Sequence, residues 1–371
     1  MSGIEQTVHL KEWTSSADRA LGADVRVEFG RLPRRIGKAY GHLAGFAVRM
    51  RINHTTAATS DAATGEEFYA FLDQPRMRVA GVDLFKAGLD GRDIRDDAVF
   101  RNGQPLIKDP SDVAANHNTT GETVDVTVIY RFADVDGDHA RDGLISLALL
   151  DHLKDPDTAF EFTLGSAMPL AATGWTINSI DALNAWAILR YEPDEVRGPL
   201  PVLGAKNFDE DTATVLPAVA GAVTRLDYAV VRPTLEETGG QDVSAWTGIT
   251  IRQEERTLQT KDADEMGLAT TIDVVRPRTG TPPDDCDPET GGYLALFLPR
   301  PYADTNEKIS ADVGLTVKSR NQHTRTRILS RQLVAFTQAM KNEAARYQVG
   351  APEPIATRSL PAQLLTRRLV K

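Results

Sequence analysis

The stretch Phe46-Ala47-Val48-Arg49-Met50-Arg51-Ile52-Asn53 decides the fold class of this chain. Its even-numbered positions are all apolar, whereas Arg49, Arg51 and Asn53 alternate with them. Successive side chains of a β-strand point to opposite faces of the sheet. The alternation therefore predicts a strand that buries one face in a core and turns the other toward water.

Segments with the same patterning lie on both sides of this stretch. Those in the first half of the chain are 25–29, 123–130, 160–164 and 183–191. In residues 76–85 the apolar positions change phase at Gly81, which predicts a β-bulge at that glycine. Residues 144–150 form an apolar run interrupted only by Ser146, and this run fits either a strand buried on both faces or a short helix.

A second series of β-patterned segments follows a break at 192–212, which is rich in proline and acidic residues and which we expect to be a linker. The members of this series are 226–231, 246–251, 268–275, 293–298 and 313–317. Many short strands with irregular loops indicate sandwiches or barrels, and long loops favour the jelly roll. The sequence therefore predicts an all-β chain of two consecutive jelly-roll β-sandwiches.

Helical spacing occurs at two places. Apolar residues four apart predict a short helix within 10–21, and the apolar spacing from Ile328 to Tyr347 predicts a helix near the C-terminus. The predicted divisions of the chain are an N-terminal arm with a short helix (1–24), a first jelly roll (25–198), a second jelly roll (199–340) and a C-terminal tail (341–371).

The composition limits what such a chain does. Its 371 residues are 41% hydrophobic and 25% charged, which is ordinary for a globular protein, and the net charge is −10. This acidic balance argues against a protein whose whole surface binds nucleic acid, and the clustered basic residues are too few for sequence-specific binding. Cys286 is the only cysteine, which excludes an intrachain disulfide and a cysteine zinc site. We also expect no secretory signal and no membrane-spanning helix.

The motifs of the common enzyme classes are absent from the sequence. It contains no Walker-type or dinucleotide-binding glycine motif, no nucleophile elbow and no His-Glu-x-x-His segment. Its seven histidines are scattered, and acidic doublets such as Glu66-Glu67 would point to opposite faces of a strand rather than pair across a cleft. We therefore expect that the chain is not an enzyme. An enzyme on a β-sandwich scaffold, such as a cupin-like oxygenase or a glycoside hydrolase, ranks third among the interpretations.

Carboxylates gather in Asp134-Val135-Asp136-Gly137-Asp138 and at Asp142. Oxygen ligands at alternate positions suit a hard cation such as Ca²⁺. The spacing departs from an EF-hand, because glycine stands fourth rather than sixth and Ile145 replaces the final glutamate. Because Asp and Gly also favour turns, we expect a solvated acidic turn. A Ca²⁺ site formed by Asp134, Asp136, Asp138 and Asp142 is the alternative, and no other cofactor is expected.

Positive charge is concentrated between two predicted strands and in the tail. The first cluster is Arg31, Arg34, Arg35 and Lys38, and the second is centred on Arg367 and Arg368. Such clusters can face an anionic membrane surface or the acidic patch of a partner. A solvated loop whose arginine side chains lie along the surface also explains them.

Three segments occur in an order that is informative as a whole. They are Phe29-Gly30-Arg31-Leu32-Pro33, then residues 41–50, then residues 124–164 with an apolar run and Phe160-Glu161-Phe162. This order resembles the double jelly-roll major capsid proteins of tailless, membrane-containing icosahedral bacteriophages. The resemblance spans roughly residues 25–335 and rests on layout rather than on invariant motifs.

The resemblance implies a structural viral coat protein without a catalytic site. Three subunits would form a pseudo-hexagonal capsomer, and these homotrimers would tile an icosahedral shell over an internal membrane. The partners would be further copies of the chain, other virion structural proteins and headgroups of the inner membrane, with the two basic clusters as candidate contacts. The chain would be assembled in the host cytoplasm and reside in the virion.

A binding module is the alternative interpretation. A carbohydrate- or receptor-binding β-sandwich, such as a phage spike or a lectin-like module, would show the same strand pattern. Aromatic residues, which stack on sugars, make up only 6% of the chain, and this counts against it.

Overall fold

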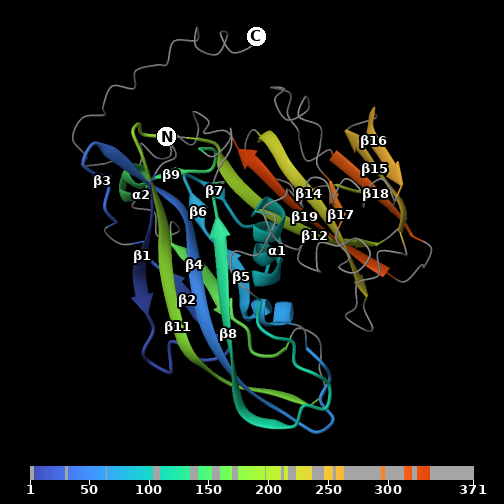
Figure 1. The fold of residues 1–371 in the computed structure, drawn as a ribbon. Helices are drawn as coiled ribbons and strands as arrows, with labels where there is room; N and C mark the ends of the chain where they lie inside the picture. Colours follow the sequence, from blue (N-terminus) through green and yellow to red (C-terminus); the bar gives the residue numbers. More distant parts are fainter. Residues whose placement is uncertain are drawn as a thin grey trace.

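The computed structural model shows two pairs of β-sheets side by side (Figure 1). The first pair takes its strands from residues 4–192 and the second from residues 200–334. The described residues are 4–29, 32–63, 65–102, 109–133, 141–152, 159–168, 174–196, 198–209, 213–215, 223–235, 246–253, 256–262, 294–296, 313–319 and 324–334.

The first pair contains a six-stranded sheet built around one long strand. That strand is β4 (Ala39–Thr56), and it pairs antiparallel with β11 (Trp175–Glu192), β8 (Thr119–Arg131), β3 (Arg35–Ile36) and β9 (Ile145–Ser146), while β1 (Ile4–Glu12) pairs with β11. The alternating stretch from Phe46 lies within β4, where Met50 is paired with Val126 and both are fully buried. The predicted strand is confirmed.

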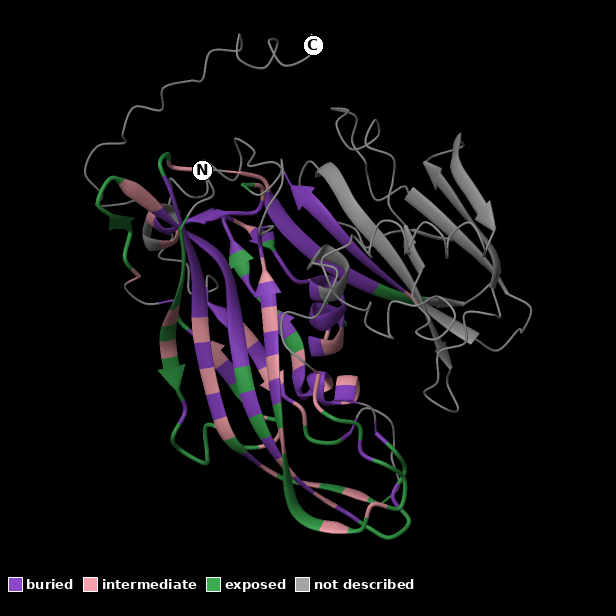
Figure 2. Ribbon diagram, in the orientation of Figure 1, coloured by how far each residue is buried: buried purple, intermediate pink, exposed green. Residues whose placement is uncertain are grey.

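A three-stranded sheet covers the inner face of β4. It consists of β2 (Asp24–Val27), β10 (Phe160–Leu164) and β5 (Leu72–Arg76), with β10 in the centre. Aromatic rings fill the space between the two sheets: the centroid of Phe46 lies 3.9 Å from that of Phe160 and 5.8 Å from that of Tyr130. The alternation of buried and exposed residues along β4, β8 and β11 is visible in Figure 2.

Short helices fill the loops of this first sandwich. A 3-10 helix, η1 (Gly65–Phe71), precedes β5, and α1 (Gly91–Asn102) follows the small hairpin of β6 (Arg78–Val79) and β7 (Val82–Asp83). The apolar run at 144–150 is divided between β9 and α2 (Leu147–His152), so each of its two interpretations describes part of it. Neither described α-helix has the length and apolar character needed to cross a bilayer.

The second pair consists of two four-stranded sheets. One has the order β12 (Leu200–Asp209), β19 (Thr324–Val334), β14 (Val223–Leu235), β17 (Leu294–Leu296). The other has the order β13 (Ala213–Val215), β18 (Val313–Ser319), β15 (Trp246–Gln253), β16 (Arg256–Asp262). Strands predicted at 226–231, 246–251, 293–298 and 313–317 are present, whereas the one predicted at 268–275 lies outside the described residues.

Both helices expected from apolar spacing are corrected within the described residues. Residues 10–21 contain the end of β1 followed by turns, and Ile328 to Leu333 belong to β19. β19 pairs with β12 on one side and β14 on the other, and its described residues from Ile328 to Val334 are buried. A strand covered on both faces loses its period of two, and its apolar spacing then resembles that of a helix.

Two local predictions are also corrected. The phase change near Gly81 is a tight hairpin turn and not a bulge: Ala80 and Gly81 both have positive φ, 50° and 79°, and β6 pairs with β7 across them. The break at 192–212, which we expected to be a linker over its whole length, contains the start of a strand: β12 begins at Leu200. The connecting segment between β11 and β12 is therefore only 193–199.

Candidate functional site

The first candidate site is the junction at which β12 and β19 meet the first sandwich. Leu200, Val202 and Leu203 of β12 belong to the same buried hydrophobic cluster as Phe46. Two backbone hydrogen bonds cross the junction. Leu203 N donates to Leu84 O at 2.8 Å, and Lys86 N donates to Leu203 O at 3.0 Å. The two sandwiches therefore share a core and a short stretch of backbone pairing at this point.

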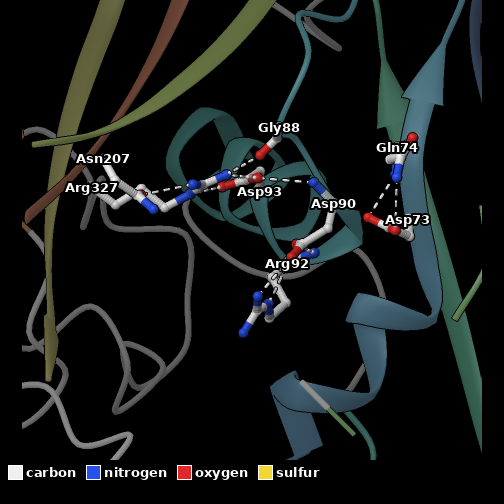
Figure 3. Close-up of polar contacts among 8 residues, drawn as sticks. All are labelled: Asp73, Gln74, Gly88, Asp90, Arg92, Asp93, Asn207 and Arg327. Atoms are coloured by element: carbon white, nitrogen blue, oxygen red, sulfur yellow. Dashed lines mark hydrogen bonds and ion pairs between the residues drawn. The ribbon is translucent and has the colours of Figure 1, made fainter. Parts of the chain in front are cut away.

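An ion pair joins β19 to α1 across this junction (Figure 3). The Arg327 guanidinium donates to both carboxylate oxygens of Asp93, at 2.7 and 2.5 Å. It also donates to Gly88 O at 2.7 Å and to Asn207 Oδ1 at 2.9 Å. Asp93 Oδ2 in turn accepts the Asp90 N–H at 3.0 Å. A bidentate, largely buried arrangement of this kind fixes orientation as well as contact.

The same cations act on a second carboxylate near the start of α1. Burial alone would raise the pKa of Asp90, but the positive charges of Arg92 and Arg327 lower it below its ordinary value. Arg92 Nη2 lies 2.7 Å from Asp90 Oδ2. Asp90 is thus held ionised beside Arg327, close to the ion pair that Arg327 forms with Asp93.

Arg331 is a second cation of β19 that points into the junction. Only 2% of the residue is exposed, and its guanidinium donates to the backbone carbonyls of Arg131 and Phe132 at the end of β8. Buried cations are costly unless they are hydrogen-bonded. These two hydrogen bonds form when β19 lies against the end of β8, so Arg331 links the geometry of the two sandwiches.

Between the sandwiches, Glu195 and Val196 of the connecting segment contact the first one. His42 of β4 is fully buried, and its Nε2 accepts the Val196 N–H at 2.8 Å. Glu195 Oε1 accepts the Ser146 hydroxyl at 2.9 Å. Burial lowers the pKa of His42, although the nearby carboxylates Glu192 and Glu195 oppose the shift. The imidazole is therefore neutral near pH 7 and serves as an acceptor for the connecting segment.

The helix α1 is itself anchored by a buried arginine. Arg95 is 3% exposed and contacts Asp96 at 3.3 Å, Glu66 of η1 at 3.4 Å and Asp109. This network holds α1 against the first sandwich, so that Asp93 is presented to Arg327 from a fixed position.

The second candidate site is a basic hairpin formed by β3 and the start of β4. Arg35 and Ile36 pair with Tyr40 and Ala39, and Gly37 turns the chain with φ of 59°. The Arg35 guanidinium lies 4.2 Å from the centroid of the Tyr40 ring, a cation–π contact. Ile36 is 49% exposed. The structure thus brings together three of the predicted basic residues, Arg34, Arg35 and Lys38, all of which are exposed.

The outer face of the six-stranded sheet is polar below this hairpin. Arg49 and Arg51 of β4 both contact Asp125 of β8, at 3.2 and 2.9 Å. The hydrogen bond from Arg51, aided by Arg49, lowers the pKa of Asp125. These pairs are exposed and contribute little to stability, since solvent and salt screen them.

Several predicted site residues lie outside the described part of the chain. They are Arg31, Asp134, Asp136, Asp138, Arg367 and Arg368. Asp142 is described and lies beside Gly143, whose φ is 83°. No group of three or more metal-ligating side chains is found among the described residues. The Ca²⁺ site and the role of the tail therefore stay predictions.

Sequence reasoning did not find the junction residues His42, Asp93, Arg327 and Arg331. A signal was present in Thr324-Arg325-Thr326-Arg327, which alternates β-branched and charged residues as a strand does. The helical spacing of the apolar residues that follow concealed it. The contacts themselves join residues more than 150 positions apart, which local patterns do not reveal.

Comparison with known proteins finds similarity in structure and not in sequence. No protein-family model matches the chain, and no curated protein matches it. The crystal structure of the STIV MCP superposes with a TM-score of 0.56 at 12% identity, covering 90% of this chain and 97% of that one. A chain of the atomic structure of Sulfolobus Turreted Icosahedral Virus gives 0.57 at 11% identity, with 93% and 98% covered.

The chain has the double jelly-roll fold of viral major capsid proteins. The predicted all-β class with two consecutive jelly rolls is confirmed. The major capsid protein P2 from bacteriophage PM2 shows a weaker likeness, with a TM-score of 0.48 at 10% identity over 90% of this chain and 98% of that one. In a double jelly roll, the junction described above is the place where the two sandwiches are fixed side by side.

Proposed function

We propose that this chain is the major capsid subunit of a virus. The observation that carries the proposal is the likeness of the whole chain, over 90% or more of both partners, to the STIV MCP and to a chain of the Sulfolobus Turreted Icosahedral Virus. The shared core and the Arg327–Asp93 ion pair support it, because a subunit of a lattice must present fixed faces to its neighbours.

The proposed assembly begins with a homotrimer. Three copies, each with two jelly rolls side by side, present six similar sandwiches around an axis, which gives a pseudo-hexagonal outline. Such trimers would tile an icosahedral shell over an internal membrane, together with other structural proteins of the virion. The subunit would be assembled in the host cytoplasm. Catalysis and sequence-specific nucleic-acid binding form no part of this role.

An exposed sheet edge supports self-association. β1 pairs with β11 on one side, and most of its residues are exposed, as Figure 2 shows. An edge strand of this kind is a surface on which further chains can pack. An obligate interface of upward of ~2,000 Å² would keep the trimer intact on dilution.

Light scattering combined with electron microscopy of the same sample tests the proposal. We expect a mass three times that of the chain that persists on dilution, and particles with a hexagonal outline or sheets and shells of them. A monomer that fails to assemble and that binds saccharides on a glycan array would overturn the proposal in favour of a binding module.

A further inference from the structure

The end of the six-stranded sheet that carries the basic hairpin also carries the exposed apolar residues of the described chain. Among residues 4–207 and 327–334, so far as their burial is described, two large hydrophobic side chains are markedly exposed, Ile4 at 69% and Ile36 at 49%. Ile36 lies in the hairpin between Arg35 and Lys38. A positive cluster and two exposed isoleucines at one end of an acidic protein call for a common explanation.

The register of the strands places Ile4 beside the hairpin. Ile4 is paired with Tyr191, and Tyr191 is paired with Gly41 of β4. The Gly41 N–H donates to Arg34 O at 2.7 Å. One row across the sheet thus runs from Ile4 to Arg34, at the same end as β3 in Figure 1. The apolar and cationic side chains belong to one surface.

We propose that this surface, which we call the basic end (Ile4, Arg34, Arg35, Ile36, Lys38 and Tyr40), binds the surface of an anionic lipid bilayer. The inference rests on the proposed function in one respect: in a capsid, the bilayer that this surface contacts would be the internal membrane. Arginine and lysine attract anionic headgroups, while isoleucine and tyrosine enter the boundary between headgroups and acyl chains. Neither signal is strong alone, and their combination gives stable attachment.

The shape of the basic end favours a lipid surface over an acidic protein. Its apolar residues stand at a strand terminus and at the tip of a two-residue hairpin, whose turn is made by Gly37. A projecting tip penetrates a fluid headgroup layer, whereas a stable protein interface requires a broad complementary area of at least ~1,000 Å². The contact with Tyr40 holds the Arg35 guanidinium at this end.

Charge elsewhere on the molecule gives the binding an orientation. The chain has a net charge of −10, so an anionic membrane repels most of its surface. Two acidic residues on the neighbouring strands are engaged within the protein: Glu5 of β1 contacts Arg131 at 3.0 Å, and Glu192 of β11 contacts Arg190 at 2.9 Å. The chain therefore approaches a membrane with β3 and the start of β1 first.

Co-sedimentation of the full chain with vesicles tests the inference. We expect binding to vesicles of phosphatidylcholine with phosphatidylserine, weakened by salt, and little binding to phosphatidylcholine alone. The variant R34S/R35S/K38S should lose binding by roughly five-fold for each cation removed. The variant I36S should bind more weakly while keeping the salt dependence of the wild type, because it loses apolar contact and keeps every cation of the basic end.

A matched variant, K11S/R76S/R78S, removes three exposed cations elsewhere and changes the net charge equally. It should bind vesicles like the wild type. Equal binding by the two triple variants, or no binding by the wild type, would overturn the inference. Because the oligomeric state is measured on the same preparations, a chain that trimerises without binding vesicles refutes the lipid contact alone and leaves the capsid role standing.

Discussion

At the scale of single residues, Arg331 shows how a buried charge fixes the geometry of the junction. Among the residues whose burial the structure describes, it has the largest fully buried side chain, and it donates to backbone carbonyls of the other sandwich. Replacing it with alanine removes these donors and opens a cavity. We expect R331A to lower the free energy of unfolding by about 3 kcal/mol, measured by urea denaturation.

The control for this prediction is R51A on the exposed face of β4. Arg51 also pairs with a carboxylate, but the pair is solvated, so the loss should be below about 1 kcal/mol. Equal destabilisation by the two variants would show that Arg331 contributes no more than a surface charge.

His42 makes stability depend on pH. Because burial lowers its pKa below the ordinary 6.5, the unfolded chain binds a proton at a higher pH than the folded chain does. Its contribution to stability is therefore complete above about pH 6.5 and is lost as the pH falls toward the folded pKa. Protonation also places an N–H against the Val196 N–H that Nε2 accepts.

Urea midpoints measured between pH 7.5 and pH 5 check this sign. The variant H42Q keeps an acceptor but does not titrate, so its midpoint should fall less with acid than that of the wild type. The exposed His9, changed to glutamine, is the matched control and should leave the wild-type slope unchanged. The same slope in H42Q and the wild type would exclude His42 as the source.

At the scale of elements, the Arg327–Asp93 pair couples β19 to α1. Arg327 has 18% and Asp93 5% of its side chain exposed, so removing one partner leaves a poorly solvated charge. We expect R327M and D93N each to lower the free energy of unfolding by about 2–4 kcal/mol. The double variant should lose less than the sum of the two, with a coupling of about 1–3 kcal/mol. Additive losses would mean that the pair does not act as a unit.

Strands with one buried face carry a period of two that can be recognised in the sequence. The alternation around Met50 and Val126 follows from a sheet with one solvated face, so β4 and β8 could be found from sequence. The edge strand β1 was missed although Val8 and Leu10 alternate with polar residues, because most of its residues are exposed and the apolar row is short. In β19 burial on both faces removes the period of two from which strands are recognised.

The candidate sites divide in the same way. The basic hairpin could be located from sequence because its cations are neighbours in the chain. The exposure of Ile36 and the position of Ile4 beside it depend on strand register, which one sequence does not specify. The junction depends on pairs such as Arg327 and Asp93, which are 234 positions apart.

At the scale of the whole molecule, the junction predicts that the two sandwiches unfold together. They share a hydrophobic cluster to which β12 contributes Leu203 and β19 contributes Leu329 and Val334. Calorimetry of the wild type should therefore show one transition with equal calorimetric and van't Hoff enthalpies. The fragment 1–198 lacks both strands and should bind a hydrophobic dye and melt at a lower temperature, because Leu84 and Phe85 lose their cover.

In R327M the coupling between the two sandwiches weakens, and the single transition should broaden or split. Two transitions in the wild type, one of them coinciding with that of the fragment, would show that the sandwiches are independent domains, and the fixed geometry inferred for a lattice subunit would have to come from contacts between subunits instead.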